Sequence, residues 1–199
     1  MPATSVTALL FALAASAAPA KQSWESTMKP DVEAWFLPHS ALVEVDGQAL
    51  GRGIVRLEIT DPKRTLRVRV SAEGFEPAEA TVEAGKVANR QFFLALRPAG
   101  FEKQVAPGDP SSMALAASAL WRAGRVDDAA DYAEASLKAG NTPLANRILG
   151  DVWRKRGDRD QATRFYAMYL SLSDSPPDGP EIKAWLMQPK DGDITIPAR

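Results

Sequence analysis

Two stretches in the first half of the chain alternate strictly between apolar and polar side chains. Residues 54–60 and 65–71 each place three aliphatic residues at every second position. A period of two residues predicts β-strands with one buried and one solvated face. The segment Asp61-Pro62-Lys63-Arg64 between them has turn chemistry. The pattern therefore predicts that the two strands form a hairpin.

Other short apolar segments surround this pair. Residues 41–45 end at Asp46-Gly47, which predicts a tight turn back to an antiparallel strand. Residues 78–82 and 91–96 alternate more weakly, with Ala84-Gly85-Lys86 as the turn between them. Short strands with a turn signal every ~8–12 residues predict a small β-sandwich. We expect it over residues 34–97.

The apolar period becomes helical after residues 101–112, which are rich in Pro, Gly, Asp and Ser, and we interpret residues 98–108 as a linker. Asp109 before Pro110, and Thr142 before Pro143, each predict a helix start. Several similar residues recur at a spacing of 33, namely Gly124 and Gly157, Asp127 and Asp160, Ala129 and Ala162, Tyr132 and Phe165, and Leu137 and Leu170. The change from a two-residue period to a helical period therefore predicts a two-domain protein, all-β followed by all-α.

The helical domain is expected over residues 109–187. Its last segment, from Pro180 to Met187, predicts a short capping helix in which Ile182, Trp185 and Leu186 cover the open end of the helix array. Residues 188–199 are expected to be a flexible tail.

The N-terminal segment has the character of an export signal. Residues 6–18 form an uncharged apolar run, which is shorter than the ~20 residues that a bilayer span needs. Small residues follow it in two A-x-A triplets, so we expect a signal peptide over residues 1–20, cleaved near Ala17–Ala20, and a tether over residues 21–33. The mature protein would be periplasmic or secreted, with no stable membrane span. The alternative is an Ala-rich tail on a cytoplasmic protein.

Composition limits the chemistry. The chain has 24 basic and 25 acidic residues, one His and no Cys. The balanced charge argues against a nucleic-acid partner. Without Cys there is no disulfide, thiol nucleophile or lipidated Cys, so the protein is not expected to be a lipoprotein. The one histidine, His39, has no nucleophile or orienting acid in a recognisable pattern, and no phosphate-binding loop occurs. We therefore predict no catalytic residues, cofactor or metal, and a function other than catalysis.

The β segment carries a recognisable order of motifs: Pro38-His39-Ser40-Ala41, a short strand ending in Asp46-Gly47, then Gly51, Gly74-Phe75-Glu76-Pro77, and Leu94 with Leu96. In this order residues 38–97 resemble a PEGA domain. The resemblance implies a small envelope-associated β-sandwich that acts as an accessory module, and it brings no catalytic residue.

The helical segment also resembles a known repeat. Its second unit carries Leu149-Gly150, Trp153, Gly157, Ala162, Tyr166, Leu170 and Pro176. Residues 109–176 resemble a degenerate pair of tetratricopeptide (TPR) repeats. The resemblance implies a concave groove presenting Trp121, Arg122, Arg147, Asp151, Arg154 and Lys155. Such a groove would hold an extended peptide with acidic side chains or a C-terminal carboxylate. The alternative is a solvated helix face with i,i+4 charge pairs.

Together these features predict an exported adaptor or scaffold that mediates protein–protein interactions in the bacterial cell envelope. The alternative function is a module that binds the cell wall or a polysaccharide. It would use a basic face of the β-sheet formed by Arg56, Arg67 and Arg69. The alternative is a solvated sheet face whose charges prevent edge aggregation.

Overall fold

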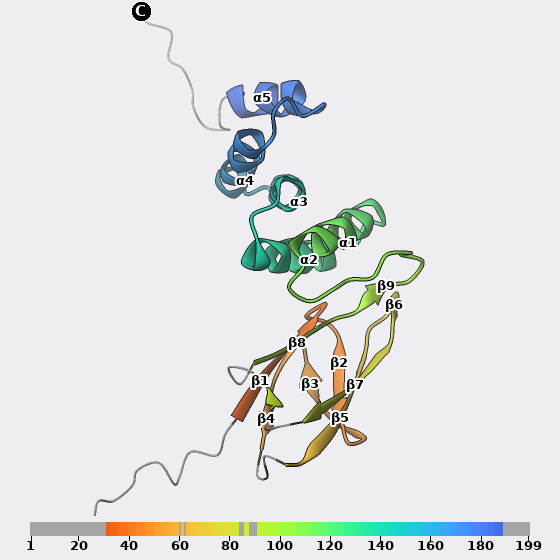
Figure 1. Cartoon of the computed structure of the whole chain (residues 1–199). Coiled ribbons are helices and arrows are strands. Elements are labelled where there is room, and N and C mark those ends of the chain that lie inside the picture. Colours follow the sequence, from red (N-terminus) through yellow and green to blue (C-terminus); the bar gives the residue numbers. More distant parts are fainter. Residues whose placement is uncertain (1–30, 60, 62, 84–85, 88–90, 189–199) are drawn as a thin grey trace, which may run out of the picture.

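The computed structural model describes residues 31–59, 61, 63–83, 86–87 and 91–188. In this part of the chain a β-rich region precedes the helices (Figure 1), which confirms the predicted fold class. The predicted signal peptide and nearly all of the predicted tether and tail lie outside the described residues, as do Ala84 and Gly85 of one predicted turn. Figure 1 shows the helices extending away from the β region, with α5 farthest from it.

The β region contains two principal sheets. One has the order β4 (Ile54–Glu58), β1 (Asp31–Leu37) and β8 (Gln91–Ala95). The other has the order β3 (Gln48–Arg52), β2 (Leu42–Val45), β5 (Thr65–Ser71) and β7 (Ala78–Glu83). A short ribbon pairs β6 (Phe75–Glu76) with β9 (Arg97–Pro98). Alternate residues of the strands are buried, as expected where two sheets pack face to face.

The predicted hairpin between residues 54–60 and 65–71 is wrong. β4 pairs with β1 in one sheet, whereas β5 pairs with β2 and β7 in the other. The chain between β4 and β5 therefore crosses from sheet to sheet. The alternation of apolar and polar residues predicts which face of each strand is buried, but not which strand it pairs with. The segment between β4 and β5 is long enough to cross from one sheet to the other.

Strand β1 begins at Asp31, so residues 31–33 belong to the sheet and not to a tether. It occupies the centre of its sheet, antiparallel to β4 and parallel to β8. Val32, Ala34 and Phe36 are buried, and the side chain of Trp35 lies on the opposite, outer face. This strand was not predicted, although its buried apolar residues alternate with polar or outward-facing ones.

The tight turn at Asp46-Gly47 is confirmed. β2 and β3 pair antiparallel around it, and both turn residues have positive φ, 50° and 84°. Such a turn matches the twist of a hairpin. Asp46 also accepts hydrogen bonds from the Arg67 backbone at 3.0 Å and from Arg64 at 2.7 Å, and these lower its pKa.

The helices form two similar pairs followed by one further helix. The first pair is α1 (Pro110–Arg122) and α2 (Val126–Ala139), the second is α3 (Pro143–Lys155) and α4 (Arg159–Leu172), and α5 spans Gly179–Met187. α3 starts 33 residues after α1 (143 against 110), and α4 starts 33 residues after α2 (159 against 126). The predicted helix starts are confirmed, because Asp109 and Thr142 both accept capping hydrogen bonds from backbone N–H groups.

A continuous core joins the two regions. Buried side chains from β1 through α3 form one cluster, which includes Phe36, Leu96, Met113 and Tyr132. A smaller cluster joins α4 to α5 through Tyr166, Tyr169 and Ile182, with Trp185 and Leu186 packed against it. α5 thus covers the end of the second pair, as predicted. None of the helices in the described part of the chain is long and apolar enough to span a bilayer.

Candidate interaction site

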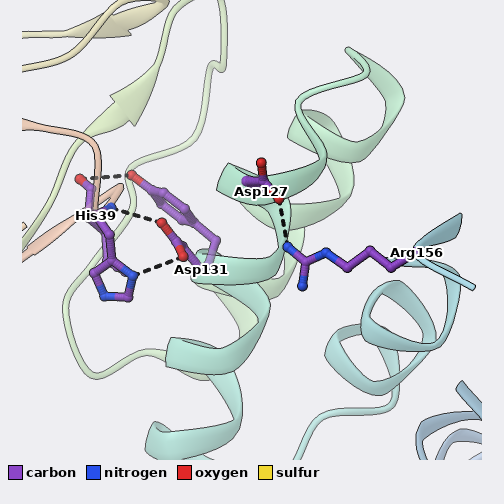
Figure 2. Close-up of polar contacts among 6 residues, drawn as sticks. His39, Asp127, Asp131 and Arg156 are labelled. Atoms are coloured by element: carbon purple, nitrogen blue, oxygen red, sulfur yellow. Dashed lines mark hydrogen bonds and ion pairs between the residues drawn. The ribbon is translucent and has the colours of Figure 1, made fainter. Parts of the chain in front are cut away.

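Helix α2 lies between the β-sandwich and the second helix pair, and polar contacts leave it on both sides (Figure 2). Toward the sandwich, the Asp131 carboxylate accepts a hydrogen bond from the His39 backbone N–H at 2.8 Å. His39 Nδ1 lies 2.9 Å from the other carboxylate oxygen. This two-point contact fixes the loop after β1 against α2.

An aromatic contact lies beside this pair. Tyr132 is fully buried, and its hydroxyl donates to the backbone carbonyl oxygens of Leu96 and Leu37. Its ring stacks on Phe75, with 6.0 Å between centroids and 13° between ring planes. Burial raises the pKa of Tyr132 well above its usual value. Because Phe75 belongs to β6, the contact joins the short ribbon to α2.

Arg125 completes this contact from the start of α2. Its guanidinium lies 4.5 Å from the centroid of the Phe75 ring, donates to the Glu73 carbonyl at 2.6 Å and pairs with Asp128 at 2.7 Å. A Cβ at Gly74 would lie 1.8 Å from Arg125 Nη1, and Gly74 has φ +75°. The positive φ favours glycine at this position, and a side chain there would also displace the end of Arg125. The Gly74-Phe75 turn is the part of the β region that receives α2.

On its other side α2 contacts the second helix pair. Asp127 accepts a hydrogen bond from Arg156 at 2.6 Å (Figure 2). Arg156 also lies 5.0 Å from the centroid of the Trp153 ring. Asp127 and Asp131 both belong to α2, so this one helix contacts the sandwich and the second helix pair.

A cavity of about 520 Å³ opens beside the His39–Asp131 pair. We call it the interdomain pocket. Its lining comes from β1, β8, the segment before α1, α1 and α2, and includes Trp35, Leu37, Phe93, Met113, Glu134 and Lys138. Mostly apolar walls with a few charged groups are typical of binding sites.

The structure divides the predicted groove. Arg147 forms ion pairs with Asp151 and with Asp178, which precedes α5. Burial opposes the charged guanidinium, but hydrogen bonds to Asp178 and Asp151 outweigh it and raise the pKa of Arg147. Tyr166 donates to Asp151 at 2.6 Å. Arg147 and Asp151 therefore serve the contact among α3, α4 and α5.

The remaining groove residues lie nearer the surface. Arg154 is 3.8 Å from Glu181 and 5.4 Å from the centroid of the Trp185 ring, both on α5. Lys155 lies 5.6 Å from the centroid of the Trp121 ring, so α3 contacts α1 at this point. Arg122 is exposed and donates to the Ser118 carbonyl of its own helix at 3.3 Å. Of the six predicted residues, Trp121 and Lys155 lie side by side on α1 and α3, and the guanidinium of Arg122 bonds to its own helix.

The predicted basic sheet face is not a single surface. Arg56 is on β4, whereas Arg67 and Arg69 are on β5 in the other sheet. Arg69 has Glu44 opposite on β2 and Glu79 opposite on β7, with an ion pair to Glu79 at 3.8 Å. The surface around Arg67 and Arg69 therefore alternates in charge, because strand pairing brings acidic residues beside the arginines.

In the sequence, His39 has no partner in a recognisable pattern, and Tyr132 is only one member of the 33-residue repeat. The acceptor and ring partners of both residues are far away in the chain. The pattern Gly74-Phe75 was noted, but nothing in it indicated that α2 packs there. No group of three or more His, Cys, Asp or Glu side chains suited to a metal ion occurs within the described residues.

Residues 37–99 match the sequence profile of the PEGA domain, which confirms that part of the predicted resemblance. The matched segment runs from the end of β1 past β9 and covers the ribbon that contacts α2. A comparison with curated proteins found no significant match to the chain.

Proposed function

We propose that this protein is an exported, non-enzymatic adaptor of the bacterial cell envelope that holds a partner protein through a rigid pair of modules. The PEGA-like sandwich is one module, and the helix pairs, as degenerate TPR repeats, are the other. The observation that carries the proposal is the continuous core across the two modules, together with the contacts of α2 on both sides. Two modules in one body present surfaces at a fixed separation, which suits a scaffold.

The repeat interpretation rests on local geometry. The two helix pairs repeat every 33 residues, and a Cβ at Gly150 would lie 2.4 Å from the Tyr166 ring. Close approach of this kind at a small residue is what the repeat motif needs between its two helices. The fold does not itself define a function, so the partner must be found by experiment.

Export is tested by mass. We expect intact-mass measurement of the natively expressed protein to show loss of about 20 N-terminal residues, because the A-x-A triplets end there. A full-length mass would favour the cytoplasmic form of the adaptor.

The adaptor function is tested by crosslinked pull-down from the envelope of the native host, with the full chain tagged at its C-terminus. The groove variant carries Arg122→Glu and Lys155→Glu, both at exposed positions. Arg147 is left unchanged, because its ion pairs hold α5. The matched control carries the same charge change at exposed Lys63 and Lys103.

A defined partner retained by the native chain and the control, but not by the groove variant, would support the TPR-like surface as the binding site. Equal retention by all three chains would show that the groove is not the binding site, but the adaptor function would stand. A native chain that retains no defined protein would contradict the adaptor function.

The wall-binding alternative has weaker support, because acidic residues flank Arg69 on both neighbouring strands. It predicts sedimentation with purified wall material, lost at high salt or in an Arg67→Glu, Arg69→Glu variant. If the chain sediments and retains no protein, this alternative replaces the adaptor.

A further inference from the structure

The floor of the interdomain pocket is an apolar row on the outer face of a sheet. Trp35 on β1 is paired with Ile54 on β4 and with Phe93 on β8. Paired residues of neighbouring strands project to the same face. Ile54 is 46% exposed, so the row reaches from the pocket to open solvent.

The pocket also reaches the edge of β8. Gln91, Phe92 and Phe93 all line it. Gln91 and Phe93 point to one face of β8 and Phe92 to the other, so the pocket runs along this strand and includes atoms of all three residues. In the order β4-β1-β8, no described strand pairs with the far side of β8. Its unpaired backbone groups therefore offer a template for another extended chain.

The helical wall of the pocket is charged. Asp131, Glu134 and Lys138 follow one another at three and four residues and so share one face of α2. The Asp131 carboxylate is hydrogen-bonded to His39, and Lys138 lies 5.1 Å from the centroid of the Trp35 ring. Among the described residues, Glu134 has no hydrogen bond or ion pair, although it is half-buried. Lys138, four residues after Glu134, lies over the Trp35 ring instead, so a positively charged group that enters the pocket would supply the partner of Glu134.

We propose that the interdomain pocket binds an extended segment of a partner protein, which pairs with β8 as a fourth strand of the sheet. A large apolar side chain of that segment packs on Trp35 and Phe93, and a Lys or Arg on the same side of the segment faces Glu134. This mode combines backbone hydrogen bonds for affinity with side-chain pockets for specificity. The proposal rests on the adaptor function and names the chemistry of the bound partner.

The test uses the full chain and a dye-labelled peptide with capped ends, Lys-Thr-Phe-Thr-Lys-Thr-Val. Its Lys, Phe and Val side chains fall on one side when it is extended. Companion peptides carry Leu or Trp in place of Phe, Glu in place of both Lys, or N-methyl groups on alternate amides. Binding is followed by fluorescence anisotropy, and amide hydrogen exchange is followed over Gln91–Ala95.

We expect at least one apolar-basic peptide to bind and to slow exchange of the β8 amides. N-methylation should weaken binding at least about tenfold, because the lost amides can no longer pair with the strand edge. Glu134→Gln should weaken it about two- to fivefold, as expected for a partly exposed ion pair. The matched control, Glu102→Gln, removes an exposed carboxylate that does not line the pocket and should leave binding unchanged.

Failure of every apolar-basic peptide to bind, or equal binding of the N-methylated peptide, would overturn the proposal. Two other occupants would be recognised by exchange without peptide. Protection of β8 that grows with protein concentration would indicate a second copy of the chain. Protection lost on removal of residues 1–30 would indicate the chain's own N-terminal segment, and either result would contradict the partner assignment.

The pull-down separates this inference from the adaptor function. If a Glu134→Lys chain retains the same partner as the native chain, the pocket is not the binding site but the adaptor function stands. If the native chain retains no partner, the adaptor function itself fails.

Discussion

The hydroxyl groups of the three tyrosines in this chain all join separate elements. Tyr132 donates to carbonyls of the β region, Tyr166 to Asp151 on α3, and Tyr169 to Asp178 before α5. Burial raises the pKa of each one, that of Tyr169 to about 12. At the scale of single residues, the ionisation of each phenol therefore reports on one contact of the α region with a neighbouring element.

We therefore expect almost no tyrosinate absorbance near pH 10 in the folded protein. In concentrated guanidinium chloride all three side chains should ionise near their ordinary pKa of about 10. Because the folded values are raised, the stability from the neutral phenols is fully present below pH ~10 and is lost as pH rises above it. Ultraviolet titration measures this directly, and a tyrosine that ionises at pH 10 in the native protein would contradict its assigned contact.

The substitution Tyr132→Phe should destabilise the contact between the β region and α2. Removing the buried hydroxyl takes a donor from the Leu96 and Leu37 carbonyls but keeps the ring against Phe75. The expected loss in the free energy of unfolding is about 1–3 kcal/mol, because a buried acceptor loses its partner. Urea denaturation checks this value. A change below about 0.5 kcal/mol would mean that the hydroxyl does not hold the two regions together.

Elements of the fold differ in how far the sequence determines them. The alternation of residues 65–71 and the caps at Asp109 and Thr142 are local signals, and the structure confirms the strand and both helix starts. The partner of β4 was not predictable, because a strand's pairing depends on contacts far away in the chain. The division of the groove has the same origin, since Asp178 reaches Arg147 from a segment 31 residues later.

Close packing of α3 on α4 predicts that Gly150→Ala destabilises the protein. Alanine is favoured over glycine in a helix by about 1 kcal/mol, but its Cβ would lie 2.4 Å from the fully buried Tyr166 ring. Overpacking of this kind costs about 1–3 kcal/mol, so a net loss of stability is expected. A Tyr166→Leu background should reduce the loss in a double-mutant cycle. Increased stability in the native background would show that the two helices are not in close contact.

The docking of α5 is expected to weaken in acid. Burial alone would raise the pKa of Asp178, but hydrogen bonds from Arg147 and Tyr169 lower it below its usual value. A lowered folded pKa gives stability that is present above the unfolded value of ~3.9 and is lost as pH falls through the folded value. The Ile182 methyl resonances should therefore shift in this acid range. Asp178→Asn should abolish that pH dependence, and an unchanged profile would contradict the role of Asp178.

At the scale of the whole molecule, α2 connects the sandwich to the second helix pair. This helix contributes to the contact with the sandwich through Asp131 and Tyr132, and to the contact with the second helix pair through Asp127. The interdomain pocket exists only because this arrangement brings Trp35, Phe93 and Glu134 together. Those residues are widely separated in the chain, so no local motif indicates the pocket.

The continuous core implies that the sandwich and the helix pairs behave as one body. Differential scanning calorimetry of the full chain tests it most directly. We expect a single transition whose calorimetric enthalpy equals its van't Hoff enthalpy, and Tyr132→Phe should lower its midpoint without splitting it. Two separable transitions in the native chain, or a Tyr132→Phe chain with an unchanged midpoint, would contradict a rigid two-module scaffold.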